Sequence, residues 1–163
     1  MMNVRLGDLK LSEQEKKLFH SLIDSAMFSE GKYTKEFEDK WAAYVGTKYC
    51  TTFNSGTSAM MAGFAALQNS KKYRVKKGSK VITTPLTYIA TINSALTTGM
   101  EPVFADVGDD FNIDPEKIAE LLEESKDTNE FSVLLPVHLL GYVAEMDKIN
   151  AMAKKYGLVV FED

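Results

Sequence analysis

The amino-acid sequence predicts an α/β fold, a three-layer α/β/α arrangement in which one sheet lies between two layers of helices. Segments with helical spacing of apolar residues alternate with short apolar runs through most of the chain, which is typical of this class. The length of 163 residues suits a single domain with a substantial core. A composition of 45% hydrophobic and 26% charged residues is that of an ordinary soluble globular protein.

Two helices are expected before the alternation begins. Ser12 followed by Glu15 has the spacing of a capping box and predicts a helix over 12–27. After a loop, Thr34 can cap a second helix. Gly46 stands where a glycine commonly terminates a helix, so the second helix is expected to end there.

The rest of the chain is expected to alternate between strands and helices. The pair Asp114-Pro115 marks the start of one helix, since proline is favoured in the first helical turn. The strands are expected at 49–53, 81–84, 102–105, 131–137 and 158–161. The helices between them are expected at 57–68, 88–97, 114–124 and 144–155.

Composition disfavours several classes of function. The net charge is −4, from 23 acidic and 19 basic residues, whereas general nucleic-acid binders carry a basic excess. A single cysteine, Cys50, excludes an internal disulfide framework, and two distant histidines, His20 and His138, do not suggest a metal site. No apolar run reaches transmembrane length and the N-terminus lacks the apolar stretch of a signal peptide, so a cytoplasmic protein without a membrane partner is expected.

A candidate phosphate site follows the first expected strand, at Asn54–Ser58. Gly56 lets the backbone approach an anion, while Ser55, Thr57 and Ser58 supply hydroxyl groups. The helix that follows offers free amides and the positive end of its dipole. Taken by itself, this segment could instead be an ordinary helix N-cap, in which a serine or threonine opens the helix and binds no phosphate.

Three further side chains follow expected strands, where ligands of open α/β sheets bind. Tyr88 could stack on a planar ring, and Asp163 could pair with a protonated ring nitrogen. Taken singly, each residue is more often structural: Tyr88 a half-buried aromatic residue, Asp163 a turn acid and His138 a hydrogen-bonded structural histidine. A phosphate cradle, a stacking aromatic ring and a carboxylate are together what pyridoxal 5′-phosphate (PLP) requires, so Gly56, Tyr88 and Asp163 are expected to meet at one edge of the sheet.

Several ordered motifs resemble the DegT/DnrJ/EryC1/StrS family of sugar aminotransferases, which are PLP-dependent enzymes of fold type I. The motifs are GKYTKEFE (31–38), YVGTKY (44–49), NSGTSA (54–59), VITTPLTYIAT (81–91), EPVFADV (101–107), NIDP (112–115), PVHL (136–139) and LVVFED (158–163). The resemblance extends from about residue 11 to residue 163.

This resemblance implies transfer of an amino group, usually from glutamate, to the keto group of a nucleotide-linked sugar. It implies that Ser55, Gly56 and Thr57 anchor the cofactor phosphate, that Tyr88 stacks on the ring and that Asp163 keeps the ring nitrogen protonated. It also implies a homodimer with active sites at the subunit interface, and 32–44 is a candidate for part of that contact.

The sequence departs from the family pattern in two places. Leu140 stands where the family often has tyrosine before Gly141. The Schiff-base lysine of the family lies downstream of the aspartate that Asp163 matches, so no catalytic residue is assigned. Residues 1–163 are therefore expected to be part of the large, cofactor-binding domain, without its C-terminal part or the small domain, and to be inactive alone.

Three alternatives stay open at this point. A dehydratase of the same family uses the same cofactor. The second alternative is a non-catalytic fragment that only binds a phosphate or a partner. It is favoured because residues 1–163 do not contain the Schiff-base lysine of the family. A nicotinamide-dependent oxidoreductase is disfavoured, because no three-glycine fingerprint follows the first expected strand.

Overall fold

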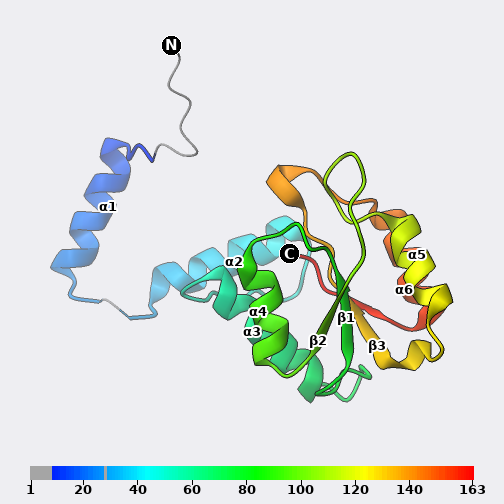
Figure 1. The fold of residues 1–163 in the computed structure, drawn as a ribbon. Coiled ribbons are helices and arrows are strands. Elements are labelled where there is room, and N and C mark those ends of the chain that lie inside the picture. The colour runs from blue at the N-terminus through cyan, green and yellow to red at the C-terminus, as the bar shows by residue number, and fades with distance from the viewer. Residues whose placement is uncertain (1–8, 28) are drawn as a thin grey trace, which may run out of the picture. The chain divides into compact units, whose positions relative to one another are not determined.

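The computed structural model describes residues 9–27 and 29–163 (Figure 1). The chain divides into two compact units, one ending at Thr52 and the other spanning Phe53–Asp163. No helix among the described residues is long and apolar enough to span a membrane.

The first unit holds two helices whose ends are set by local signals. Helix α1, Glu13–Asp24, begins with the expected capping box, in which Ser12 and Glu15 each accept a hydrogen bond from the other's backbone amide. Helix α2, Lys32–Val45, ends at Gly46, which has the left-handed conformation (φ 75°). The prediction that Thr34 caps α2 is wrong, because the cap position is held by Gly31, three residues earlier and in extended backbone, and the helix begins at Lys32.

The strand expected at 49–53 does not form. A strand needs a neighbouring strand to satisfy its amides and carbonyls, and the described part of the first unit contains none. Instead, the backbone amide and the hydroxyl of Thr52 donate to Glu38 Oε1 at 2.8 and 3.0 Å. Tyr49 and Phe53 remain 76% and 47% exposed, so the two aromatic side chains of this segment lie outside the core.

The second unit is built on a parallel four-stranded sheet in the order β2-β1-β3-β4. The strands are β1 (Lys80–Thr83), β2 (Glu101–Phe104), β3 (Phe131–Leu134) and β4 (Val159–Val160). Backbone hydrogen bonds between the segments that follow β3 and β4 continue the pairing beyond these two strands. The Phe161 amide donates to the Leu134 carbonyl at 2.9 Å, and the Asp163 amide donates to the Pro136 carbonyl at 2.9 Å. The four strands expected at 81–84, 102–105, 131–137 and 158–161 are confirmed; the first two begin and end one residue earlier than expected, and the last two are shorter.

Helices cover both faces of this sheet (Figure 1), which confirms the three-layer prediction. Helices α3 (Gly56–Asn69) and α4 (Ile89–Thr97) share one core cluster with Val81 and Val133. Helices α5 (Pro115–Glu124) and α6 (Met146–Tyr156) share the other with Ile82 and Leu134. Adjacent strand residues thus face opposite layers, as the pleat requires. Two 3₁₀ turns, Thr128–Glu130 and Leu139–Gly141, complete the unit.

Candidate functional site

The segment predicted to bind phosphate forms the N-terminal end of α3. Ser55 is the cap residue, and its Oγ accepts a hydrogen bond from the Ser58 amide at 3.1 Å. The helix starts at Gly56, one residue before the expected start at Thr57. The amides of Gly56 and Thr57, at the first two helical positions, have no acceptor among the described residues. They therefore leave two donors and a positive dipole end available to an anion.

Space is open around this helix start. Gly56 is exposed, and a Cβ atom added there would meet no heavy atom within 4 Å. The Ser55 hydroxyl has a structural role as well, because it also donates to Ser58 Oγ at 3.1 Å. Ser55 therefore acts as an ordinary helix cap. Gly56 and Thr57 still have the unpaired backbone amides that the predicted phosphate site needs.

Tyr88 is the residue that precedes α4. It occupies the cap position with an extended backbone, and its side chain makes no capping hydrogen bond. The side chain is 77% exposed. Its ring is consequently available to a planar ligand at the end of β1.

Asp163 is held at the end of β4 through its backbone and its side chain. Its amide donates to the Pro136 carbonyl, and its carbonyl accepts from the His138 amide at 2.8 Å. Its Oδ2 accepts a hydrogen bond of 2.5 Å from Thr91 Oγ1, while Oδ1 has no partner among the described residues. One carboxylate oxygen is thus fixed and the other is free.

The structure brings Asp163 close to the first turn of α4, because Thr91 is the third residue of the helix that follows Tyr88. Gly56 lies at the corresponding end of the neighbouring helix. Gln68 Nε2, near the end of α3, donates to the carbonyl of Thr98, at the end of α4, at 3.0 Å. The two packed helices therefore run in the same direction (Figure 1), and their N-terminal ends lie at the same edge of the sheet.

Two groups around Asp163 were not assigned a site role from the sequence. Thr91 was visible only as the last residue of the motif 81–91, with no chemical signal of its own. His138 Nδ1 accepts from the Ala144 amide at 3.2 Å, and Nε2 lies 3.0 Å from Glu162 Oε2. A histidine that accepts at Nδ1 carries its proton on Nε2, so His138 donates to Glu162 and ties the two strand ends together.

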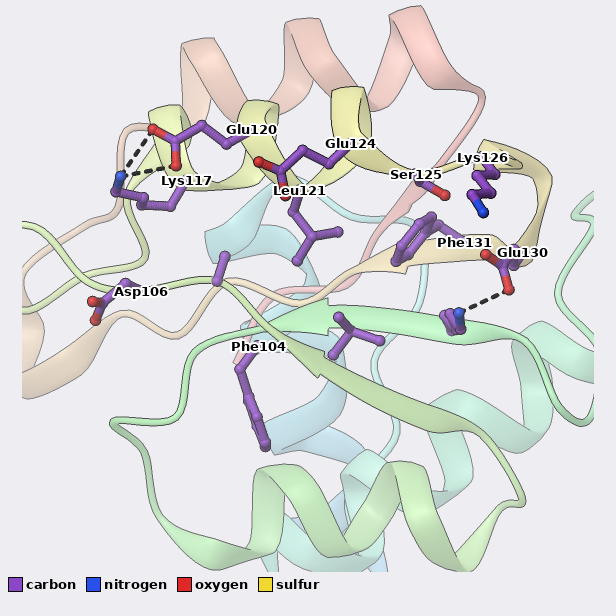
Figure 2. Close-up of a pocket in the computed structure, with 13 residues that line it drawn as sticks. Phe104, Asp106, Lys117, Glu120, Leu121, Glu124, Ser125, Lys126, Glu130 and Phe131 are labelled. Carbon is purple, nitrogen blue, oxygen red and sulfur yellow. Dashed lines mark hydrogen bonds and ion pairs between the residues drawn. The ribbon is translucent and has the colours of Figure 1, made fainter.

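A cavity of about 550 Å³ lies elsewhere, between β2 and α5, and contains none of the predicted site residues (Figure 2). Two ion pairs line it, Lys117 with Glu120 at 2.8 Å and Lys80 with Glu130 at 2.7 Å. Each carboxylate raises the pKa of the lysine it pairs with. The raised pKa values keep both lysines positively charged, which suits ion pairing rather than nucleophilic chemistry.

Among the described residues, no group of three or more histidine, cysteine, aspartate or glutamate side chains is placed so that it could hold a metal ion.

Comparison with known proteins relates the chain to one family. The model of the DegT/DnrJ/EryC1/StrS aminotransferase family matches residues 9–163. The spore coat polysaccharide biosynthesis protein SpsC of Bacillus subtilis is 39% identical over 142 residues, covering 86% of this chain and 34% of that protein. The UDP-4-amino-4,6-dideoxy-N-acetyl-beta-L-altrosamine transaminase of Campylobacter jejuni is 39% identical, covering 86% of this chain and 35% of that protein.

A solved structure extends this likeness to the whole chain. The E. coli GDP-4-keto-6-deoxy-D-mannose-3-dehydratase with bound hydrated PLP aligns with a TM-score of 0.87 and 32% identity. The alignment covers 100% of this chain and 41% of the dehydratase. The chain thus spans between a third and about two fifths of the length of these relatives.

Proposed function

Because the chain belongs to the DegT/DnrJ/EryC1/StrS aminotransferase family, we propose that it carries the cofactor-facing part of a PLP-dependent enzyme. The proposed reaction transfers an amino group, with glutamate as donor, to the keto group of a nucleotide-linked sugar. Residues 1–163 correspond in this proposal to part of the large, cofactor-binding domain. The transaminase relative, whose name contains a UDP-linked sugar, supports the substrate class.

The residues at the edge of the sheet fit PLP by their chemistry. The free amides of Gly56 and Thr57, with the Ser55 hydroxyl nearby, suit a phosphate group, which is an anion with several acceptor oxygens. The exposed ring of Tyr88 suits stacking on the pyridine ring. The free Oδ1 of Asp163 suits a protonated ring nitrogen, which needs one acceptor.

Each residue has a distinct task in this proposal. PLP, when bound, supplies a protonated ring that withdraws electrons from the reacting carbon. Asp163 holds the proton on the ring nitrogen, because a neighbouring carboxylate favours the charged form. Tyr88 keeps the ring in one plane and covers one of its faces, while the start of α3 anchors the phosphate and so fixes the position of the whole group.

The observation that carries the proposal is the anchoring of Asp163 beside the first turn of α4 with one carboxylate oxygen left free. An acceptor of this kind is held in advance of binding, so it needs no rearrangement to meet a ring nitrogen. It lies at the carboxyl edge of a parallel sheet, where ligands of such folds bind.

A dehydratase is the second candidate, because the aligned E. coli structure is a dehydratase with bound PLP. The groups proposed to hold the cofactor are the same in both reactions. The two reactions differ in their products, since only amino transfer leaves nitrogen on the sugar.

Association into a homodimer is also proposed. Exposed apolar side chains gather in the loop after β3, at Leu140, Tyr142 and Val143. Patches of this kind often mark contact surfaces between chains. Sedimentation measurements test this point.

The phosphate assignment is tested with Gly56→Asp, compared by titration with PLP and with pyridoxal, which lacks the phosphate. An aspartate fits the open space at Gly56 and suits the first turn of a helix, so the fold should be retained. Its charge should weaken PLP binding by about tenfold or more while leaving pyridoxal binding unchanged. Equal affinities of parent and variant for PLP would overturn the proposed site.

A further inference from the structure

We propose that Thr91 is a positioning residue that holds the Asp163 carboxylate in one orientation and directs its free oxygen toward the ring nitrogen of the cofactor. This inference rests on the proposed function. It adds a residue that touches neither the substrate nor the cofactor and acts through Asp163.

The contact between the two residues is short and buried on the threonine side. Thr91 Oγ1 lies 2.5 Å from Asp163 Oδ2, and the two residues are 72 positions apart in the sequence. Thr91 is only 1% exposed. Short hydrogen bonds of a hydroxyl to a carboxylate are among the stronger ones in proteins, so the contact restrains the side chain of Asp163.

Thr91 differs from the other hydroxyl residues of its helix. Ser94 Oγ donates to the Thr91 carbonyl at 2.8 Å, and Thr97 Oγ1 donates to the Asn93 carbonyl at 2.7 Å, so both bond back to the helix backbone. This back-bonding is the ordinary behaviour of such residues in a helix. In α4 the Thr91 hydroxyl instead donates to another element of the fold.

The direction of the hydrogen bonds follows from counting protons. An ionised Asp163 only accepts, so the single proton of the Thr91 hydroxyl is donated to it. Thr87 Oγ1 lies 2.9 Å from Thr91 Oγ1 and must then be the donor of that bond. The chain Thr87 to Thr91 to Asp163 therefore points toward the carboxylate, and each bond polarises the next.

The backbone hydrogen bonds of Asp163 do not orient its carboxylate, so the bond from Thr91 sets that orientation. The Pro136 carbonyl and the His138 amide hold the main chain of Asp163 in place. They do not restrict rotation of the carboxylate about its side-chain bonds. Because Oδ2 is occupied by Thr91, Oδ1 is the oxygen presented to a ligand, and the ordering cost of binding is met before the ligand arrives.

The test compares PLP with 1-deazapyridoxal 5′-phosphate, an analogue that has carbon in place of the ring nitrogen. Dissociation constants are measured by absorbance titration for the parent protein and for Thr91→Val, which removes the hydroxyl and keeps the shape. The variant should bind PLP about tenfold more weakly, the cost of losing one hydrogen bond to a charged group. Its affinity for the deaza analogue should be unchanged, because that ring offers no proton to Asp163.

Two further variants complete the experiment. Thr91→Ser keeps the hydroxyl and should restore most of the preference for PLP. Ser94→Ala is the matched control, since it removes a fully buried hydroxyl from the same helix that is not bonded to Asp163, and it should leave both affinities unchanged. If Thr91→Val does not fold, Thr87→Val tests the same chain of hydrogen bonds and should weaken PLP binding in the same direction by a smaller factor.

The outcomes separate the inference from the function on which it rests. A parent protein that fails to bind PLP more tightly than the deaza analogue contradicts the proposed role of Asp163. The positioning role alone is overturned if the parent prefers PLP over the deaza analogue and Thr91→Val keeps that preference. The same conclusion follows if Thr91→Val lowers the affinity for both ligands equally.

Discussion

The two units of the chain stabilise their helices in different ways. In the described part of residues 9–52, Ala42 is the single buried hydrophobic residue, and α1 buries none. Helix α2 relies on contacts within itself, such as the pair Lys40–Glu36 at 2.6 Å and the stacked rings of Phe37 and Trp41, 5.8 Å apart. Each of α3 to α6 in the second unit instead buries side chains against the sheet.

The difference teaches which features of this chain depend on the tertiary fold. Capping groups and pairs four residues apart act within one helix, so α1 and α2 form without a core. The second unit gains most of its stability from apolar burial, and the predicted cofactor groups occur there, at the ends of elements that this core holds in place.

The largest expected difference between the units concerns two phenylalanines. Phe64 is fully buried and packs edge-to-face on Phe161 with ring centres 5.0 Å apart, whereas Phe37 is 51% exposed. Phe64→Ala should lower the free energy of unfolding by about 3–5 kcal/mol, because it removes apolar contacts and leaves a cavity. Phe37→Ala should change it by less than about 0.5 kcal/mol.

Denaturant unfolding followed by circular dichroism measures both values. A cost above about 2 kcal/mol for Phe37→Ala would break the comparison, because truncation of an exposed side chain does not reach that size. It would indicate that Phe37 is covered in solution, as a subunit contact over 32–44 requires.

A second comparison uses one glycine from each unit. A Cβ atom at Gly63 in α3 would lie 2.3 Å from Phe161 Cζ, which is far inside contact distance. Gly63→Ala should therefore cost about 1–3 kcal/mol of unfolding free energy through overpacking.

Gly31→Ala is the matched substitution in the first unit. The nearest atom to the added Cβ would be Met27 Cγ at 3.4 Å, an ordinary contact. Its expected effect on the same measurement is about 0.5–1 kcal/mol, because Gly31 is the cap residue of α2 and alanine is less favoured there than glycine. A Gly63→Ala protein as stable as the parent would show that Phe161 moves freely and that the packing of α3 on Phe161 is loose.

A third comparison, with a smaller expected effect on stability, uses the capping serines of α1 and α3. Ser12 caps α1 and Ser55 caps α3 through the same kind of bond from its hydroxyl oxygen to a backbone amide. Each Ser→Ala change should cost its helix about 1 kcal/mol. Amide hydrogen exchange should report faster exchange throughout α1 in Ser12→Ala, but only in the first turn of α3 in Ser55→Ala, because burial of Phe64 holds the rest of α3. Equal spread of the effect along both helices would contradict this difference.

The smallest expected effect is the response of the first unit to acid. The hydroxyl and amide of Ser12 lower the pKa of Glu15, and the Lys40 ammonium lowers the pKa of Glu36. A carboxyl with a lowered pKa in the folded state stabilises the helix above its unfolded pKa and loses that contribution as the pH falls through its folded value. The helical circular dichroism signal should therefore decrease slightly as the pH drops from about 5 to about 3.

Lys40→Gln provides the control for this titration. The variant lacks the partner of Glu36, so its own acid-induced decrease should be smaller than that of the parent. A decrease as large as that of the parent would show that the pair Lys40–Glu36 has no part in it.

The sequence alone predicted the features that depend on neighbouring residues. The capping box at Ser12, the helix end at Gly46 and the helix start at Asp114-Pro115 are confirmed. The prediction that a helix begins at the Ser-Gly-Thr segment is also confirmed, as is the position of Tyr88 at the start of α4. A helix satisfies its hydrogen bonds within a few residues of chain, so its boundaries are readable from local composition.

Only the tertiary structure decided the features that depend on distant partners. The segment 49–53 lacked a neighbouring strand and stayed irregular, while the shorter β4 formed because β3 paired with it. Local sequence likewise does not predict that β2 lies at the edge of the sheet next to β1. Nor does it predict the hydrogen bond between Thr91 and Asp163, which are 72 residues apart. Strand pairing and side-chain contacts between elements satisfy their hydrogen bonds with groups far along the chain, so the folded arrangement determines which partners meet.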